Sequence, residues 1–492
     1  MRKTMSTLLA VTLLGVGLIG CGNSTNTPAA SKDSNSTKAT STAEATSTTN
    51  AENTSKEDAK KDFDNKELSI AVFQGGYGAD YWNEIVSKFE STYPGVKVNM
   101  TINPKVGEVI RPQIVAGNPP DFLSVTDTEQ SGIMLSLIKE KGLLDISDVF
   151  ESKALDKDET LKDMILPGML DSTRFQPYQD GKIYLAPFNA GPMGLIYNKT
   201  LFAEKGWSVP ETWDEFFALG DELKKEENFL VNADGTKTKR ALFTYQGIYP
   251  DYLEEILYPA IASAGGKETL DKVFAYEEGS FKNDTIKKVL DIFYKISKDG
   301  YLMDGTVALN HTQSQTDMMM GKALFIVNGN WMENEMKDSP RENGFEFGMT
   351  TVPVFNKGDQ KYVLSSYEQF SIPAKAKNPE LAKEFLKFLY TDESVKLFAE
   401  KANGAYALNG AKELSKPYLT KGVYDMFEAY NGSISILQGW QSLPKGSKVS
   451  VVTEMFKNTM TPVMTGQMTT DQWMDNVEKA FAQIRKEKEA SK

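Results

Sequence analysis

Hydrophobic positions become periodic at Leu68, where short strands and amphipathic helices begin to alternate. Residues 68–73 and 96–102 carry apolar side chains at every second position, which predicts two strands. Residues 80–92 and 106–115 carry them at helical spacing, with Asp80 placed to cap the first helix, and a third short strand follows at 121–125. This order predicts an α/β fold with a parallel sheet wound by helices.

The later pattern predicts further strands and helices. Two apolar runs between residues 182 and 198 flank Pro187-Phe188-Asn189-Ala190-Gly191-Pro192, which predicts a stiff crossover rather than a hairpin. Residues 213–225 predict a helix, and "GKALFIVNGNWM" (321–332) predicts a buried strand that ends in a polar-aromatic loop. Asn378, with Pro379 behind it, and Asp392 are placed to cap two consecutive helices.

The N-terminal residues have the composition of a leader and a linker. Arg2 and Lys3 precede an apolar stretch at 8–19 that is too short to span a bilayer. The sequence "LIGCG" around Cys21 resembles the lipobox of bacterial lipoproteins, which implies a signal peptide at 1–20 and a lipidated Cys21. The alternative is a plain signal peptide with an accidental cysteine. Residues 21–62 are Ser, Thr, Asn and Ala-rich, which predicts a disordered tether with a reach of roughly 35 Å.

Composition narrows the function. The chain has 492 residues, which is long enough for two hydrophobic cores. Its net charge of −12 argues against nucleic acid as a partner. It has one Cys and one His, which excludes an intrachain disulfide and a poly-His metal site. We expect no cofactor and no metal.

Four stretches in this order resemble the extracellular solute-binding proteins of bacterial carbohydrate ABC importers, the group related to maltose-binding protein. They are "ELSIAVF…YWNEIVSKFESTYPGVKV", "IVAGNPPDFLSV", "GLIYNKTLFAEKGWSVPETWDEFFALGDELKK" and "NPELAKEFLKFLYTDESVKLFAE" after "GKALFIVNGNWM". The resemblance implies a two-domain, type II periplasmic-binding-protein-like fold with a ligand cleft between domains joined by hinge strands. It places domain one at 63–187 plus 369–405 and domain two at 190–365 plus 406–488, with hinges at 187–191 and near Gln369-Phe370.

The resemblance also implies a function. The protein would be a monomer, lipid-anchored on the extracytoplasmic face of the cell membrane, that captures a sugar by domain closure and delivers it to permease subunits without making or breaking a bond. The shorter stretches "AVFQGGYGADYW" and "IRPQIVAGNPPD" resemble the branch associated with N-acetylglucosamine and chitobiose. The alternatives are a surface glycan-binding or sensor lipoprotein without a transporter and a glycoside hydrolase, which would need two facing carboxylates.

Ligands of open α/β sheets bind beyond the carboxyl ends of the strands, so we expect the site in the turns that follow strands. A sugar site needs flat rings beside polar planar groups. The candidates are Gln74, Gly76, Tyr77, Asp127, Glu129, Asn189, Asn330, Trp331, Tyr367, Glu368 and Trp440.

Several of these residues also have a structural interpretation. Tyr367 and Glu368 could be hinge scaffold, and Asp127 and Glu129 could begin a helix. The glycines of "GGYG" (75–78) fit no nucleotide fingerprint, so we expect a turn in which missing side chains let Tyr77 approach the ligand. "NADGTKTK" predicts a tight turn rather than a calcium loop, and His311 is expected to be a surface or hydrogen-bonded residue.

Overall fold

The structure, a computed structural model, describes residues 62–126, 131–444 and 446–490. All of them belong to one unit, Lys60–Lys492. Within these ranges no helix has both the length and the apolar character needed to cross a bilayer. The predicted leader and tether, Cys21, Asp127 and Glu129 lie outside the described residues.

The first sheet is built around the predicted winding unit. Its order is β2-β1-β3-β12-β4, with β1 (Glu67–Phe73), β2 (Lys97–Asn103), β3 (Phe122–Ser124), β4 (Ala186–Pro187) and β12 (Gln369–Ser371). β1 runs parallel to β2 and β3, which confirms the predicted parallel winding. β12 is antiparallel to β3 and β4, so a segment far along the chain completes the sheet.

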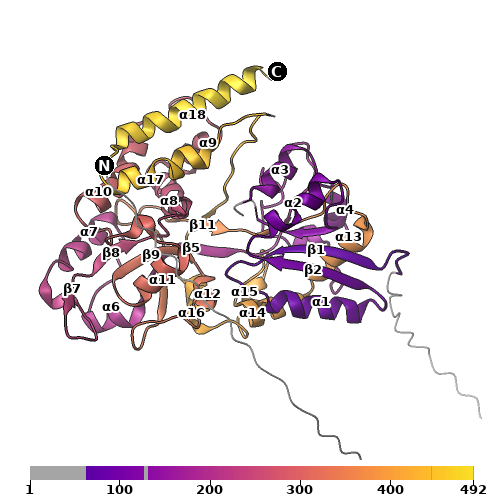
Figure 1. The fold of residues 1–492 in the computed structure, drawn as a ribbon, viewed down its shortest axis with the longest axis horizontal. Helices are drawn as coiled ribbons and strands as arrows, with labels where there is room; N and C mark the ends of the chain where they lie inside the picture. The colour runs from indigo at the N-terminus through magenta and orange to yellow at the C-terminus, as the bar shows by residue number, and fades with distance from the viewer. Residues whose placement is uncertain (1–61, 127–130, 445, 491–492) are drawn as a thin grey trace, which may run out of the picture. The chain divides into compact units, whose positions relative to one another are not determined.

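Helices pack on this sheet through their apolar faces. Figure 1 shows α1 (Asp80–Thr92) alongside β1 and β2. Phe89 of α1 lies 4.9 Å, centroid to centroid, from Phe385, which in turn lies 5.1 Å from Phe122. The other helices of this domain are α2 (Val106–Val115), α3 (Ile133–Lys139), α4 (Ser147–Glu151), α5 (Leu161–Met164), α13 (Pro379–Leu389), α14 (Asp392–Ala402) and α15 (Ala411–Ser415).

Two predicted helix caps are wrong. Ala79 is the N-cap residue of α1, so Asp80 lies in the first turn, where its charge favours the helix dipole. Thr391 rather than Asp392 caps α14, accepting a hydrogen bond from the Ser394 amide. Asn378 does stand at the N-cap of α13, but its Nδ2 donates to the carbonyls of Asn65 and Glu67 instead of its side chain capping the helix.

The second sheet has the order β13-β11-β5-β9-β8, with β10 also paired to β5. Its strands are β5 (Gly191–Asn198), β8 (Ala241–Thr244), β9 (Ala323–Gly329), β10 (Phe347–Thr350), β11 (Tyr362–Ser366) and β13 (Ile434–Ile436). β8 and β9 are parallel, whereas β5 and β9 are antiparallel. A separate hairpin joins β6 (Leu230–Val231) to β7 (Lys237–Thr238) through the predicted turn, where Gly235 has φ +79°.

Helices of the second domain enclose a core of their own. They include α6 (Lys199–Lys205), α7 (Trp213–Glu222), α8 (Glu254–Gly265), α9 (Lys267–Phe274), α10 (Asp284–Lys298), α11 (His311–Met319), α12 (Met332–Glu335), α16 (Lys421–Glu428), α17 (Met460–Met464) and α18 (Thr470–Ala490). Trp473 of α18 is fully buried, and its indole N–H donates to the Met455 carbonyl at 2.9 Å.

The buried apolar side chains fall into two large clusters. The first runs from Phe63 to Phe188 and resumes at Tyr367, whereas the second runs from Met193 to Leu364 and resumes at Ile436. Tyr406, Ala407, Leu408 and Ala411, which we expected in domain two, pack in the first cluster. Trp331 is partly buried against both clusters, so its ring lies where they meet.

The chain crosses between the two sheets at adjacent places. Residues 188–190 connect β4 to β5, and Tyr367 and Glu368 connect β11 to β12. The Phe188 amide donates to the Glu368 carbonyl at 2.8 Å, so the two crossovers are bonded to each other. In addition, an isolated antiparallel β-bridge pairs Asn189 of the first crossover with Tyr406.

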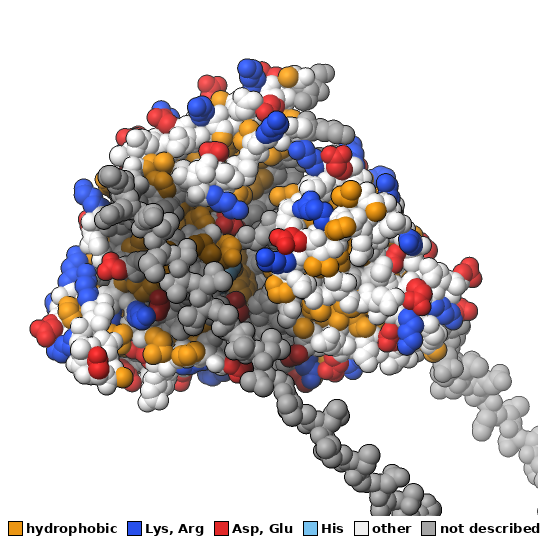
Figure 2. Space-filling model, in the orientation of Figure 1, with side chains coloured by type: hydrophobic (Ala, Val, Ile, Leu, Met, Phe, Trp, Pro, Cys, Tyr) orange, Lys and Arg blue, Asp and Glu red, His pale blue; other side chains and the backbone are white. Residues whose placement is uncertain are grey.

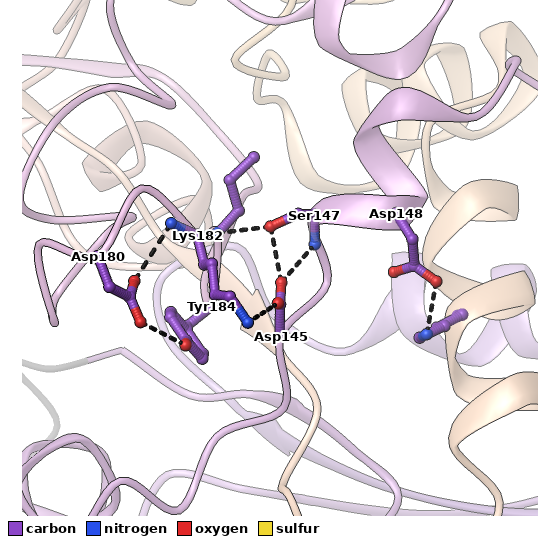
Figure 3. Close-up of polar contacts among 8 residues, drawn as sticks. Asp145, Ser147, Asp148, Asp180, Lys182 and Tyr184 are labelled. Atoms are coloured by element: carbon purple, nitrogen blue, oxygen red, sulfur yellow. Dashed lines mark hydrogen bonds and ion pairs between the residues drawn. The ribbon is translucent and has the colours of Figure 1, made fainter.

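The segment that leads into the first crossover is held by the polar contacts drawn in Figure 3. Ser147 Oγ donates to Asp145 Oδ1 at 2.6 Å, and Lys182 Nζ lies 2.9 Å from Asp145 Oδ2. Tyr184 donates its hydroxyl to Asp180 Oδ2 at 2.8 Å. Because β4 begins two residues later, these contacts fix the start of the crossover.

Candidate functional site

The turn after β1 meets the end of β9 at the junction of the two cores. Tyr77 donates its hydroxyl to Asn330 Oδ1 at 3.3 Å. The Tyr77 ring lies 6.4 Å from the Trp331 ring in an edge-on arrangement. Asn334 of α12 donates its Nδ2 to the Gly76 carbonyl at 2.9 Å. Four residues predicted separately, Gly76, Tyr77, Asn330 and Trp331, therefore lie together.

Two glycines make this approach possible. A Cβ on Gly76 would lie 2.7 Å from Cδ1 of Trp331. A Cβ on Gly191, the first residue of β5, would lie 2.6 Å from Asn330 Oδ1 and 3.0 Å from the Tyr77 hydroxyl. Real Cβ atoms essentially never come so close, so at these two positions the missing side chain makes room for neighbouring rings and amides.

The crossovers supply the next polar groups. Asn189 is fully buried, and its Oδ1 accepts a hydrogen bond from the Glu368 amide at 3.0 Å. The Glu368 carboxyl points toward the turn after β1, because its Oε1 would lie 3.7 Å from a Cβ on Gly75. Glu368 therefore combines the predicted scaffold role with a position beside the turn that carries Tyr77, and Asn189 holds its backbone.

Buried amides beside the junction have polar atoms without a hydrogen-bond partner among the described residues. They are Nδ2 of Asn189, Asn328 and Asn330 and Oε1 of Gln246. Asn328 and Gln246 lie near the carboxyl ends of the parallel strands β9 and β8, and Gln246 Nε2 donates to the Val327 carbonyl. A buried amide group without a partner costs about 1–3 kcal/mol, which a ligand hydroxyl or acetamide could offset.

A second set of rings follows β8 and begins α11. His311 stacks on Tyr249 at 4.1 Å and 17°, and the edge of Tyr252 approaches it at 5.1 Å. Tyr249, Tyr252, Gln246 and Asn328 are not among the predicted candidates. His311, expected to be a surface or hydrogen-bonded residue, is partly buried in this stack. The available signal was the "TYQGIYPDY" run (244–252), which follows an apolar strand with polar and aromatic residues.

The remaining candidates lie apart or have other partners. Gln74 follows β1, and its backbone amide donates to the Asn103 carbonyl at 3.2 Å. The Tyr367 hydroxyl bonds Ser435 Oγ at 3.1 Å, and its carbonyl accepts from Arg174 at 2.8 Å. Trp440 stacks on Tyr276 at 5.5 Å and 16°, within the aromatic cluster of α8, α9 and α18.

Burial shifts the pKa values of titratable side chains at and near the junction. Burial raises the pKa of Glu368 to about 7. Burial, followed by the charges of Glu254 and Asp251, raises the pKa of the buried Glu255 carboxyl well above its ordinary range. Burial also lowers the pKa of His311, a change that Asp251 opposes. Each of these shifts favours the uncharged form of its side chain over the charged form.

A charged pocket lies next to this cluster but is distinct from it. Its volume is about 580 Å³, and α12, α14 and α16 contribute to its walls, with Asn334 between the pocket and Gly76. Lys199 and Asp425 pair across it at 2.9 Å.

The face in Figure 2 is hollowed, with hydrophobic side chains gathered around the hollow and charged ones mostly on the outer surface.

The arrangement combines partnerless amides, tilted rings and carboxyls that favour the neutral form, at a junction between two domains. It suits an uncharged polyhydroxylated ligand, whose hydroxyls meet the amides and whose C–H faces meet the rings. In the part of the chain that the structure describes, no cluster of three or more His, Cys, Asp or Glu could hold a metal ion.

Comparison with known proteins agrees with this geometry. Residues 75–396 match the model of the bacterial extracellular solute-binding protein family. A curated relative, the diacetylchitobiose binding protein NgcE of Streptomyces coelicolor, is 26% identical over 347 residues, which cover 68% of each chain.

Solved structures share the fold. The complex of the solute-binding protein RafE with raffinose has a TM-score of 0.64 at 20% identity and covers 85% of this chain and 99% of its own. A chitin oligosaccharide binding protein has a TM-score of 0.64 at 19% identity and covers 86% of this chain and 100% of its own.

The expected two-domain, type II α/β fold is thereby confirmed. The similar proteins are solute-binding proteins, which agrees with the expectation that this protein is not an enzyme. The family match spans well over half of the chain and includes the turn after β1, both crossovers and the loop after β9. The chain belongs to the bacterial extracellular solute-binding protein family.

Proposed function

We propose that this protein captures a sugar of the chitooligosaccharide class in the cleft between its domains and delivers it to the permease of an ABC transporter. Tyr77 and Glu368 would meet the ligand from the side of the first sheet, and Asn328, Asn330 and Trp331 from that of the second. Contacts from both domains would favour the closed form, which the permease would then recognise.

The observation that carries the proposal is the set of buried amides without partners beside the junction. Asn189, Asn328, Asn330 and Gln246 are each fully or almost fully buried, yet each has a side-chain atom without a hydrogen bond. Buried polar atoms in native proteins are usually paired, so this group of four unpaired amides supports a site for a polar ligand.

The names of the similar proteins support the ligand class. NgcE and a second relative, DasA of the same organism, are both diacetylchitobiose binding proteins, and one structural neighbour is a chitin oligosaccharide binding protein. An N-acetyl sugar carries an acetamide, which can bond the free Nδ2 groups of Asn189 and Asn330 through its carbonyl.

Anchoring at Cys21 would keep the folded domains near the permease. The lipobox-like sequence before Cys21 and the polar segment after it support this part of the proposal. A Cys21→Ala variant should be released from the membrane fraction into the medium, and retention of the variant on membranes would contradict a lipid anchor.

A thermal-shift panel tests the ligand class. The panel would include N-acetylglucosamine, diacetylchitobiose, triacetylchitotriose, raffinose, maltotriose and xylotriose. At a hundredfold excess over Kd a ligand stabilises by about 2.7 kcal/mol. We expect the chitooligosaccharides to raise the melting temperature most, whereas no shift with any sugar would contradict the proposal.

A further inference from the structure

The Glu368 carboxyl occupies an unusual place. It belongs to the second crossover, and its backbone bonds both to Asn189 and to Phe188 of the first crossover. Its side chain faces the turn after β1, where Gly75 leaves room for it and where its charge acts on the Tyr77 hydroxyl. Glu368 thus touches both crossovers and the turn that meets Asn330.

The Glu368 carboxyl has no opposing charge paired with it in the described part of the chain. Among the described residues no Lys or Arg forms an ion pair with Glu368. The charge of this carboxyl acts on the Tyr77 hydroxyl from the turn after β1. Asn189 bonds the backbone amide of Glu368 rather than its carboxyl. Arg174 bonds the residues on either side of Glu368: its guanidinium donates to the Tyr367 carbonyl and to Gln369 Oε1.

We propose that Glu368 is protonated in the ligand-bound protein and donates its O–H to a sugar oxygen, so that capture of an uncharged sugar takes up a proton. This inference rests on the proposed function. When a neutral sugar replaces water in the cleft, the carboxylate loses solvation and gains no opposing charge, which favours the protonated form. The Glu368 carboxyl is already partly buried before binding, so the ligand has only its remaining contact with water to remove.

The sign of the pH dependence follows from linkage. The pKa of Glu368 in the unliganded protein is about 7, and binding raises it further. Affinity is therefore fully present below pH 7 and is lost as pH rises toward the pKa of the bound state. Above pH 7 the Kd should rise by up to about tenfold for each pH unit.

Three variants separate this role from a structural one. Glu368→Gln keeps a donor and the shape of the protonated carboxyl, so it should bind at all pH values about as the wild type binds at pH 5.5. Glu368→Ala has neither the donor nor the charge, so it should bind more weakly than the wild type at pH 5.5, and its Kd should not depend on pH. Glu413→Gln, which changes an exposed carboxyl on α15, is the matched control and should keep the pH dependence of the wild type.

The test has one arm without ligand and one with it. In the first, carboxyl ¹³C NMR of the full folded chain, with Glu368→Gln to assign the signal, should show Glu368 titrating near pH 7. In the second, calorimetry with the most stabilising sugar of the panel, at pH 5.5, 7.0 and 8.5 and in two buffers of different ionisation enthalpy, should show proton uptake that Glu368→Gln abolishes.

The outcomes are distinguishable from failure of the proposed function. Titration of Glu368 below pH 5, a Kd independent of pH, tighter binding at pH 8.5, or an unchanged pH profile in Glu368→Gln would each overturn the inference while sugar binding stands. Absence of binding by every sugar in the panel overturns the proposed function, and the proton linkage with it.

Discussion

The Tyr77 hydroxyl donates a hydrogen bond to Asn330 Oδ1 at 3.3 Å, and this bond joins the turn of one sheet to the strand end of the other. Both residues are buried, and the Asn330 amide nitrogen stays without a partner. A ligand that bonds this nitrogen would act on both domains at once, which couples binding to the arrangement of the domains.

A double-mutant cycle between these residues should reveal direct coupling. Tyr77→Phe removes the hydroxyl and keeps the ring that packs against Phe398 at 5.1 Å. With Asn330→Ala as the second change, we expect a coupling of about 0.5–1.5 kcal/mol in the free energy of unfolding measured in urea. Strictly additive effects of the two substitutions would show that the bond contributes nothing.

Asn189 should be important for stability as well as for binding. Asn189→Ala leaves the Glu368 amide without its acceptor, so the free energy of unfolding should fall by about 1–3 kcal/mol. Urea denaturation measures this loss, with the m-value expected to stay unchanged. A variant as stable as the wild type would mean that water replaces Asn189 at the crossover.

The sequence predicted most of the fold because its signals are local. Alternation at Leu68–Val72 and helical spacing after Asp80 predicted a strand and a helix, which the structure confirms as β1 and α1. Ala71 is buried as well as Ile70 and Val72, so the sheet covers β1 more completely than the alternation indicates. The capping residues were harder to place, since Thr391 and Asp392 are adjacent and both are common cap residues. Only the Thr391 side chain accepts from a backbone amide of the helix, whereas the Asp392 carboxyl pairs with Lys157.

The site was predicted in part. Tyr77 and Trp331 follow strands and belong to short polar-aromatic loops, a pattern visible in the sequence. Their contact depends on Gly191, which lies far from both in the chain and gives no local signal. The stack of Tyr249 on His311 depends on where α11 packs in the folded protein, and the pattern of apolar residues in the sequence does not predict that position.

His311 provides a pH test of that stack. Burial lowers its pKa in the folded protein, so protonation favours the unfolded state. Stability contributed by neutral His311 should be present above about pH 6.5 and fall as pH drops below it. The melting temperature of the wild type should therefore decrease relative to His311→Phe between pH 7 and pH 5.

Since the chain has one histidine, imidazole NMR gives an independent readout. The single set of ring signals should titrate below pH 6.5. Titration above that value would contradict the buried stack.

Glu255→Gln should stabilise the protein at neutral pH. Burial raises the pKa of this carboxyl well above its ordinary range in the folded protein, while the unfolded chain ionises it above about pH 4.3. Wild-type stability is therefore lost as pH rises above that value, and the glutamine variant avoids the loss.

Melting temperatures from pH 4 to pH 8 measure this difference, which should grow with pH. Glu277→Gln, an exposed substitution after α9, should leave the curve unchanged. Equal curves for Glu255→Gln and the wild type would indicate that Glu255 is solvated and charged.

Trp331 offers the most direct test of the central claim, that a sugar binds where the two cores meet. Trp331→Ala removes the ring that contacts both cores, whereas Trp207→Ala removes a partly buried ring that packs on Phe202 in the second domain. Calorimetric titration of diacetylchitobiose should give one site per wild-type chain. It should show at least about tenfold weaker binding for Trp331→Ala and near-normal binding for Trp207→Ala. Normal affinity in Trp331→Ala, or no binding of this sugar or any other in the wild type, would contradict the account.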